Sequence, residues 1–116
     1  MYYLDMGIVV DAQRDALTRF GYALSDSTRT QVLVRLRHGG AYPADLAEAI
    51  GVSRQTLSNH LACLRGCGLV VAVPEGRRSR YELANSRIGH ALDDLLGLVL
   101  ALDDPCCSEE ARDGSH

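Results

Sequence analysis

Apolar side chains in the first third of the chain recur three or four positions apart. One such run covers residues 11–24, and a second follows Asp26 and stops at the glycine pair 39–40. Aspartate is favoured at helix N-termini because its carboxylate accepts hydrogen bonds from unpaired backbone N–H groups. Two helices are therefore expected, with these apolar positions: Leu17, Phe20, Leu24, Val32, Leu33 and Leu36.

The middle of the chain predicts a helix, a tight turn and a second helix. Pro43 suits the first turn of a short helix over residues 44–50, and Gly51 marks its end. Ser53 is a favoured N-cap and begins another helix, which we expect to run to about Arg65.

The pattern then changes to two strands and a last helix. Residues 69–73 and 78–83 read as strands joined at 74–76, a β-hairpin, and Asn85 or Ser86 can cap the helix that follows. The apolar face of that helix comprises Ile88, Leu92, Leu95, Leu96, Val99 and Leu102. The order predicts a mainly α protein with a two-stranded β-wing, a winged helix-turn-helix (α-α-α-α-β-β-α).

The last helix must bury its broad apolar face. It can pack on its own core, but pairing with a second copy would bury the face equally well, and we favour a homodimer. We expect one winged helix-turn-helix domain over residues 1–102, which also carries the dimer contacts, and a flexible acidic tail over 103–116.

Charge is segregated along the chain although the net charge is only -3. All twelve basic residues are arginines. Residues 54–80 hold five of them against Glu75 alone, whereas residues 82–116 hold eight acids against two arginines. A basic segment of this kind suits nucleic acid despite the acidic total.

Other classes of protein fit less well. No window reaches the roughly 18 apolar residues of a membrane span, and residues 1–5 do not begin a secretion signal. We expect a soluble cytoplasmic protein with no membrane partner and no small-molecule substrate. It is not expected to be an enzyme, because no convincing acid–base pair or activated nucleophile stands out.

The helix after Ser53 predicts a DNA-reading face. At about 100° per residue, Leu57, Leu61 and Leu64 form one buried stripe and leave polar side chains outside. Glutamine and asparagine bond base edges, and arginine reaches bases or phosphates, although a solvated surface helix and charge run would look similar. The candidate DNA-binding residues are Ser53, Arg54, Gln55, Thr56, Ser58, Asn59, His60, Arg77, Arg78 and Arg80.

Several segments together carry a family resemblance. They are Leu24-Ser25-Asp26-Ser27-Thr28-Arg29, Asp45-Leu46-Ala47, the run from Val52 to Leu61, and Leu64-Arg65 through Gly68-Leu69-Val70, with Glu75-Gly76-Arg77 before Tyr81. Over about residues 14–102 the chain resembles the ArsR/SmtB family of metal-sensing repressors. The resemblance implies a dimer, closed through its first and last helices, that binds double-stranded operator DNA and is released by an inducer.

The cysteines suggest what the inducer is. Cys63 and Cys67 lie four positions apart and would stand one helical turn apart on the same side, as half of a metal site, although two small buried thiols are the alternative. A third thiolate from Cys106 or Cys107 would make a sulfur-rich site that selects soft ions. A disulfide between Cys63 and Cys67 would distort the helix, which makes a redox switch the weaker interpretation.

The cysteine pattern looks like that of the cadmium- and lead-sensing branch of the family, in which a tail cysteine of the other subunit completes the site. The arsenic-type cysteine pair is absent from residues 44–50, and His90 lacks the second histidine of a zinc- or nickel-type site in the last helix. We expect cadmium or lead as the inducer. Arsenite or zinc remains possible, and so does a thiol-redox or constitutive repressor of the same fold.

Overall fold

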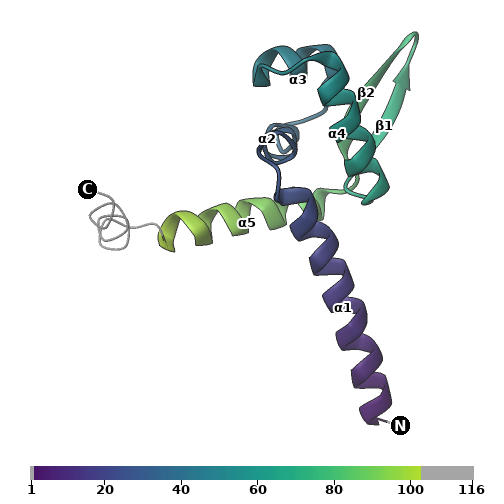
Figure 1. Cartoon of the computed structure of the whole chain (residues 1–116), viewed down its shortest axis with the longest axis vertical. Helices are drawn as coiled ribbons and strands as arrows, with labels where there is room; N and C mark the ends of the chain where they lie inside the picture. The colour runs from purple at the N-terminus through teal and green to yellow at the C-terminus, as the bar shows by residue number, and fades with distance from the viewer. Residues whose placement is uncertain (1, 103–116) are drawn as a thin grey trace. The chain divides into compact units, whose positions relative to one another are not determined.

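The structure is a computed structural model that describes residues 2–102, with side-chain surroundings for residues 10–101. Figure 1 shows these elements in chain order: α1 (Tyr2–Leu24), α2 (Ser27–Leu36), α3 (Pro43–Ile50), α4 (Arg54–Gly66), β1 (Val70–Glu75), β2 (Arg78–Leu83) and α5 (Ser86–Leu102). The chain divides into two units, residues 1–84 and 85–116. The order confirms the expected winged helix-turn-helix, and the first unit carries the helix-turn-helix and the hairpin.

Local capping explains where the helices begin. The Asp26 carboxylate accepts from the backbone N–H groups of Thr28 and Arg29 at 2.8 and 3.0 Å, and the Ser53 hydroxyl accepts from the Thr56 N–H at 3.0 Å. These bonds satisfy N–H groups that the first turn of a helix leaves unpaired. The helix α1 begins at Tyr2, nine residues before the expected 11–24 segment.

The helix-turn-helix is formed by α3 and α4, which both contact α2. Gly51 ends α3 with a φ of 87°, a conformation that glycine adopts without a Cβ clash. The buried apolar core of this unit combines the expected stripe of α4 with residues of α1, α2, α3 and β1: Ala23, Val32, Leu33, Leu36, Leu46, Ala47, Leu57, Leu61, Leu64 and Val70.

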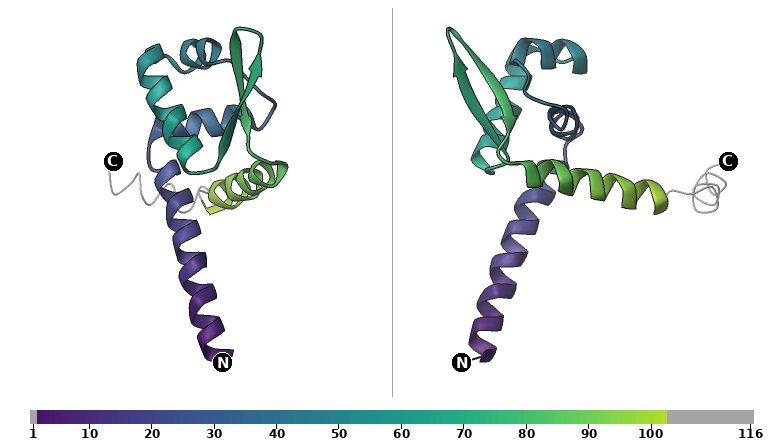
Figure 2. Two further views of the ribbon diagram at one scale, coloured as in Figure 1. Left: turned by 90° about the vertical axis from the view of Figure 1, so that its right-hand side faces the viewer. Right: turned by 180° about the vertical axis from the view of Figure 1, so that it is seen from behind.

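The wing is one antiparallel pair, in which β1 continues through Pro74 and Glu75 rather than ending at residue 73. Proline is tolerated there because a two-stranded sheet consists of edge strands. Glu75 pairs with Arg78, so the turn is Gly76-Arg77, and Gly76 has a φ of 62°. Figure 2 shows the hairpin as a narrow ribbon with this turn at its far end.

A short bridge ties the wing to the segment before α3. The N–H of Ala41 donates to the carbonyl of Tyr81 at 2.9 Å, and the N–H of Tyr81 donates back at 2.8 Å. The base of β2 is thereby fixed beside the first turn of α3.

Both terminal helices expose large apolar side chains. Val10, Leu17 and Tyr22 are exposed on α1, and in the second unit α5 exposes Leu98 and Leu100 among others. The Asn85 side chain, rather than that of Ser86, caps α5 by accepting from the N–H groups two and three residues on, at 2.9 and 3.3 Å. Over residues 2–102, no helix has the length and apolarity needed to cross a membrane.

Candidate nucleic-acid interface and thiol pair

The outer side of α4 carries exposed polar side chains, as the sequence predicts. Gln55, Ser58 and Asn59 are exposed, and the Gln55 side-chain amide donates to the side-chain oxygen Oδ1 of Asn59 across one turn at 3.1 Å. Arg54 and Thr56 are exposed in the first turn. This side has the width and polarity of a helix that enters the major groove, and base contact by these residues stays a prediction.

The Ser53 hydroxyl is already occupied within the helix. Besides capping α4, its Oγ donates to Thr56 Oγ1 at 3.0 Å. Ser53 is exposed, but its first structural role is to begin the helix. Of the two residues, only Thr56 keeps a hydroxyl proton that no bond within the helix uses.

His60 is separated from the other DNA-binding candidates because its side chain faces α2. The side chain is 20% exposed, with Nε2 3.6 Å from Asp26 Oδ1 and Nδ1 3.4 Å from Arg29 Nη1. Arginine can only donate, so His60 Nδ1 is the acceptor for Arg29 and Nε2 is the ring nitrogen that faces Asp26. Helix spacing alone did not reveal this, since the partners lie on a different helix.

The three wing arginines differ in their surroundings. Arg77 is exposed at the turn. The guanidinium carbon of Arg78 lies 3.5 Å from the centre of the Tyr42 ring. Arg80 is held by two carboxylates, with Nε 3.1 Å from Glu75 Oε2 and Nη2 2.8 Å from Glu82 Oε2. The structure therefore leaves Arg77 and Arg78 open to an external anion and neutralises Arg80 within the wing.

The thiol pair lies at the end of α4. Cys63 and Cys67 are both half-buried free thiols, and the N–H of Cys67 donates to the carbonyl of Cys63 at 3.0 Å. This helical bond confirms that the two cysteines stand one turn apart. Gly68, with a φ of 79°, and the bond from Leu69 N–H to the Leu64 carbonyl at 3.0 Å close the helix directly after the pair.

The surroundings of Cys67 favour the neutral thiol. Partial burial, and then the neighbouring Cys63 thiol, raise the pKa of Cys67, while the charges of Arg19 and Arg29 oppose the rise. Cys63 and Cys67 lie three and seven positions after His60, so the thiol pair shares the side of α4 that faces α2. A soft metal ion displaces the thiol protons when it binds, so this pair remains suited to such an ion.

Arg29 joins α1, α2 and α4, a role that the sequence analysis did not identify. It is 8% exposed; its Nε donates to the Ala23 carbonyl at 3.1 Å, and its Nη2 donates to the Tyr22 carbonyl at 2.9 Å and to Ser25 Oγ at 3.2 Å. The guanidinium also lies 4.7 Å from the Tyr22 ring centre. Its positive charge therefore satisfies the carbonyls at the C-terminal end of α1.

Two thiols alone do not complete a metal site. Among residues 10–101 no three cysteine, histidine or acidic side chains come together as a ligand cluster. Cys106 and Cys107, together with the expected 103–116 tail, lie outside the described residues. The donor chemistry of Cys63 and Cys67 fits a thiophilic ion, and the remaining ligands have to come from elsewhere.

A helix-turn-helix with an exposed polar second helix and a two-stranded wing defines a winged-helix DNA-binding protein. Residues 26–71 match the family model described as "Bacterial regulatory protein, arsR family". The chain belongs to the ArsR family of bacterial transcriptional regulators.

The particular relatives agree with this assignment. The chain is 49% identical over 109 residues to the HTH-type transcriptional regulator CmtR of Mycobacterium tuberculosis, covering 92% of each chain. The NMR structure of the cadmium metal-sensor CMTR from that organism superimposes with a TM-score of 0.61 at 52% identity, over 71% of this chain and 85% of the other. A homodimeric winged helix-turn-helix DNA-binding domain, Mb0332 of Mycobacterium bovis, gives a TM-score of 0.70 at 32% identity, over 80% and 84%.

Proposed function

We propose that the chain is a homodimeric repressor that binds operator DNA through α4 and the wing and releases it when a thiophilic metal ion binds Cys63 and Cys67. The observation that carries this proposal is the position of the thiol pair. It lies at the C-terminal end of α4, on the side that faces α2, while the polar side with Gln55 and Asn59 is exposed.

The exposed apolar side chains of α1 and α5 support the homodimer. Leu17 is 71% exposed on α1 and Leu100 is 66% exposed on α5, and burying such side chains against a second copy would stabilise both. The structural relative Mb0332 is described as homodimeric. No enzymatic activity is part of the proposal, and the protein would act in the cytoplasm, where its thiols stay reduced.

Cadmium is the preferred inducer, with lead next. Cadmium is named for a structural relative that is 52% identical, and two thiolates favour soft ions over hard ones. Cys106 or Cys107 would supply the third thiolate. Arsenite and zinc are weaker candidates because cadmium is the ion named for that structural relative.

Metal binding would act on α4, the helix that we propose contacts the bases, and α4 would respond as a rigid body. An ion that joins the end of α4 to another segment restrains that helix, so that two copies no longer match successive major grooves. Metal binding and DNA binding then oppose each other by roughly 1–3 kcal/mol, a several-fold to hundred-fold loss of DNA affinity.

The test is a titration of the reduced protein on a fluorescent duplex, selected from a random pool with the wild-type protein. Cadmium, lead, arsenite, zinc and nickel are added in turn, and DNA release is followed by anisotropy. Cadmium or lead should release the duplex, and a Cys63→Ser, Cys67→Ser double variant should bind DNA but not respond. Release by none of the ions would overturn metal sensing, and release by diamide alone would favour the thiol-redox alternative.

A further inference from the structure

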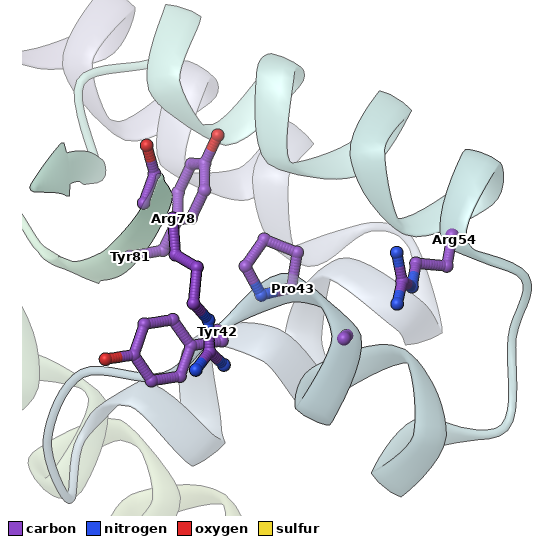
Figure 3. A pocket seen from close by; sticks show the side chains of 7 residues that line it. Tyr42, Pro43, Arg54, Arg78 and Tyr81 are labelled. Atoms are coloured by element: carbon purple, nitrogen blue, oxygen red, sulfur yellow. The ribbon is translucent and has the colours of Figure 1, made fainter. Parts of the chain in front are cut away.

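A cleft lies within the first unit, between the wing and the first turns of α3 and α4. Its volume is about 490 Å³, and Tyr42, Pro43, Arg54, Arg78 and Tyr81 contribute to its wall. Figure 3 shows Arg54 at one end, on α4, and Arg78 at the other, on β2. Of the described residues that line the cleft, these two arginines are the charged ones.

Neither arginine is neutralised within the described part of the chain. No carboxylate of residues 10–101 forms an ion pair with Arg54 or Arg78, whereas the nearby Arg80 pairs with two. Glu75, which is paired with Arg78 in the strand register, is already bound by Arg80 and by the Tyr42 hydroxyl. Two unpaired guanidinium groups that face one cleft from two elements favour an anion between them.

Tyr42 fixes the position of one of these charges. Its ring lies under the Arg78 guanidinium, at 3.5 Å from ring centre to guanidinium carbon, and its hydroxyl donates to Glu75 Oε1. The bond to Glu75, and then burial, raise the pKa of Tyr42, so the hydroxyl remains a donor. A ring held at its hydroxyl end and stacked on the guanidinium restricts the Arg78 rotamer.

We propose that this cleft holds one phosphodiester group of the DNA backbone between Arg54 and Arg78, and that Tyr42 is a positioning residue for Arg78. The proposal rests on the DNA binding proposed above and is independent of metal release. Arginine suits this role because its planar fork bonds two phosphate oxygens at once. The contact would fix the register of the protein on the duplex without reading sequence.

The test measures how DNA affinity depends on salt, in the absence of metal. A fluorescein-labelled duplex of arbitrary sequence is titrated with full-length protein across a range of salt concentrations. Arg54→Ala and Arg78→Ala should each make the slope of log affinity against log salt less steep, and the double variant should reduce its magnitude by about 0.9 in total, because one phosphate loses its positive partners; this is a loss of about eightfold at 0.1 M salt. Arg65→Ala, which removes an exposed arginine at the other end of α4, should leave the slope unchanged.

The role of Tyr42 is tested by a double-mutant cycle. Tyr42→Leu should weaken binding and lower the slope, and it should add no further loss to Arg78→Ala, because it acts through that side chain. Tyr42→Phe keeps the ring and should retain most of the affinity, which guards against a variant that fails to fold. Additive losses would overturn the positioning role, and unchanged slopes in both arginine variants would overturn the phosphate site.

A free anion is the other source of the same chemistry. Inorganic phosphate is titrated against chloride at equal ionic strength, and the backbone amide NMR shifts of Tyr42, Ala44 and Arg78 are followed. Shifts that stay weak and do not saturate by roughly 10–20 mM phosphate support the DNA backbone as the occupant. A single exposed contact is still largely unoccupied by free phosphate at that concentration. Saturation below about 1 mM would assign the cleft to a free phosphate ligand instead.

Discussion

The two sides of α4 differ in what surrounds them. The outer side exposes Gln55, Ser58 and Asn59, with a side-chain hydrogen bond between Gln55 and Asn59, whereas His60 on the inner side reaches Asp26 and Arg29 of the α2 segment. Cys63 and Cys67 follow His60 at helical spacing and share that inner side. One rigid helix thus carries an exposed reading surface and, behind it, the group that we propose as the sensor.

This arrangement teaches how a local binding event can change DNA affinity without touching DNA. A helix moves as a unit, so a ligand that shifts its inner side by a fraction of an ångström also shifts its outer side. Without metal, mutations on the inner side should therefore leave DNA binding by the outer side unchanged. With metal bound, metal binding on the inner side and DNA binding on the outer side should affect each other.

The largest expected effect is the loss of metal binding from the inner side. Cys63→Ser or Cys67→Ser should lower cadmium affinity by at least about a hundredfold, because each removes a thiolate rather than an outer-shell partner. Sulfur-to-metal charge-transfer absorption should disappear, while DNA binding of the metal-free protein stays within about twofold. Ser58→Ala is a matched control on the outer side. Absorption that survives in both cysteine variants would rule out the thiol pair as ligands.

The next largest effect concerns stability. Arg29→Met should destabilise the protein by about 2 kcal/mol, because the carbonyls of Tyr22 and Ala23 lose a buried charged donor. Urea unfolding followed by circular dichroism measures the change. Arg35→Met removes an exposed arginine from the same helix and should change stability by less than about 0.5 kcal/mol. Equal effects in the two variants would mean that Arg29 does not join the helices as described.

The outer side should respond in DNA affinity and not in metal affinity. Gln55→Ala or Asn59→Ala should weaken binding to a selected duplex by roughly tenfold and relax its base preference, as expected for loss of one base-edge contact. Both side chains are exposed, so stability should hardly change. Anisotropy with matched and mismatched duplexes measures the effect. A loss that is equal on every duplex would indicate phosphate contact rather than base reading.

Much of the fold could be predicted because its signals are local. Asp26 and Ser53 cap the helices that they were expected to begin, and Gly51 ends α3 where its pattern stops. The strand β1 extends two residues beyond the expected boundary, since Pro74 was interpreted as part of the turn although an edge strand tolerates it.

The contacts of the site were harder to predict because they join distant segments. Arg29 occupies the same helical stripe as Val32, Leu33 and Leu36, and a charge at an apolar position was a signal of burial that went unused. Nothing local connects Tyr42 with Glu75, which lie 33 residues apart. His60 was assigned to the outer side since the helical pattern of α4 alone does not show where α2 lies.

The smallest expected effect is a pH dependence that originates at Asp26, on the inner side. Backbone N–H donation from Arg29 is the main cause that lowers the pKa of Asp26 from its usual value, and the nearby His60, the Thr28 N–H and the Arg29 guanidinium lower it further against an opposing contribution from burial. A carboxyl whose pKa is lower in the folded state contributes stability that is complete above the unfolded value and is lost as pH falls through the folded value.

Asp26→Asn keeps an oxygen acceptor for the helix cap but cannot ionise. The difference in unfolding free energy between wild type and this variant should therefore be constant above about pH 5 and should shrink toward pH 3. Urea unfolding at half-unit intervals of pH measures it, and a difference that is the same at pH 3 and pH 6 would show that the Asp26 charge does not help hold the inner side of α4.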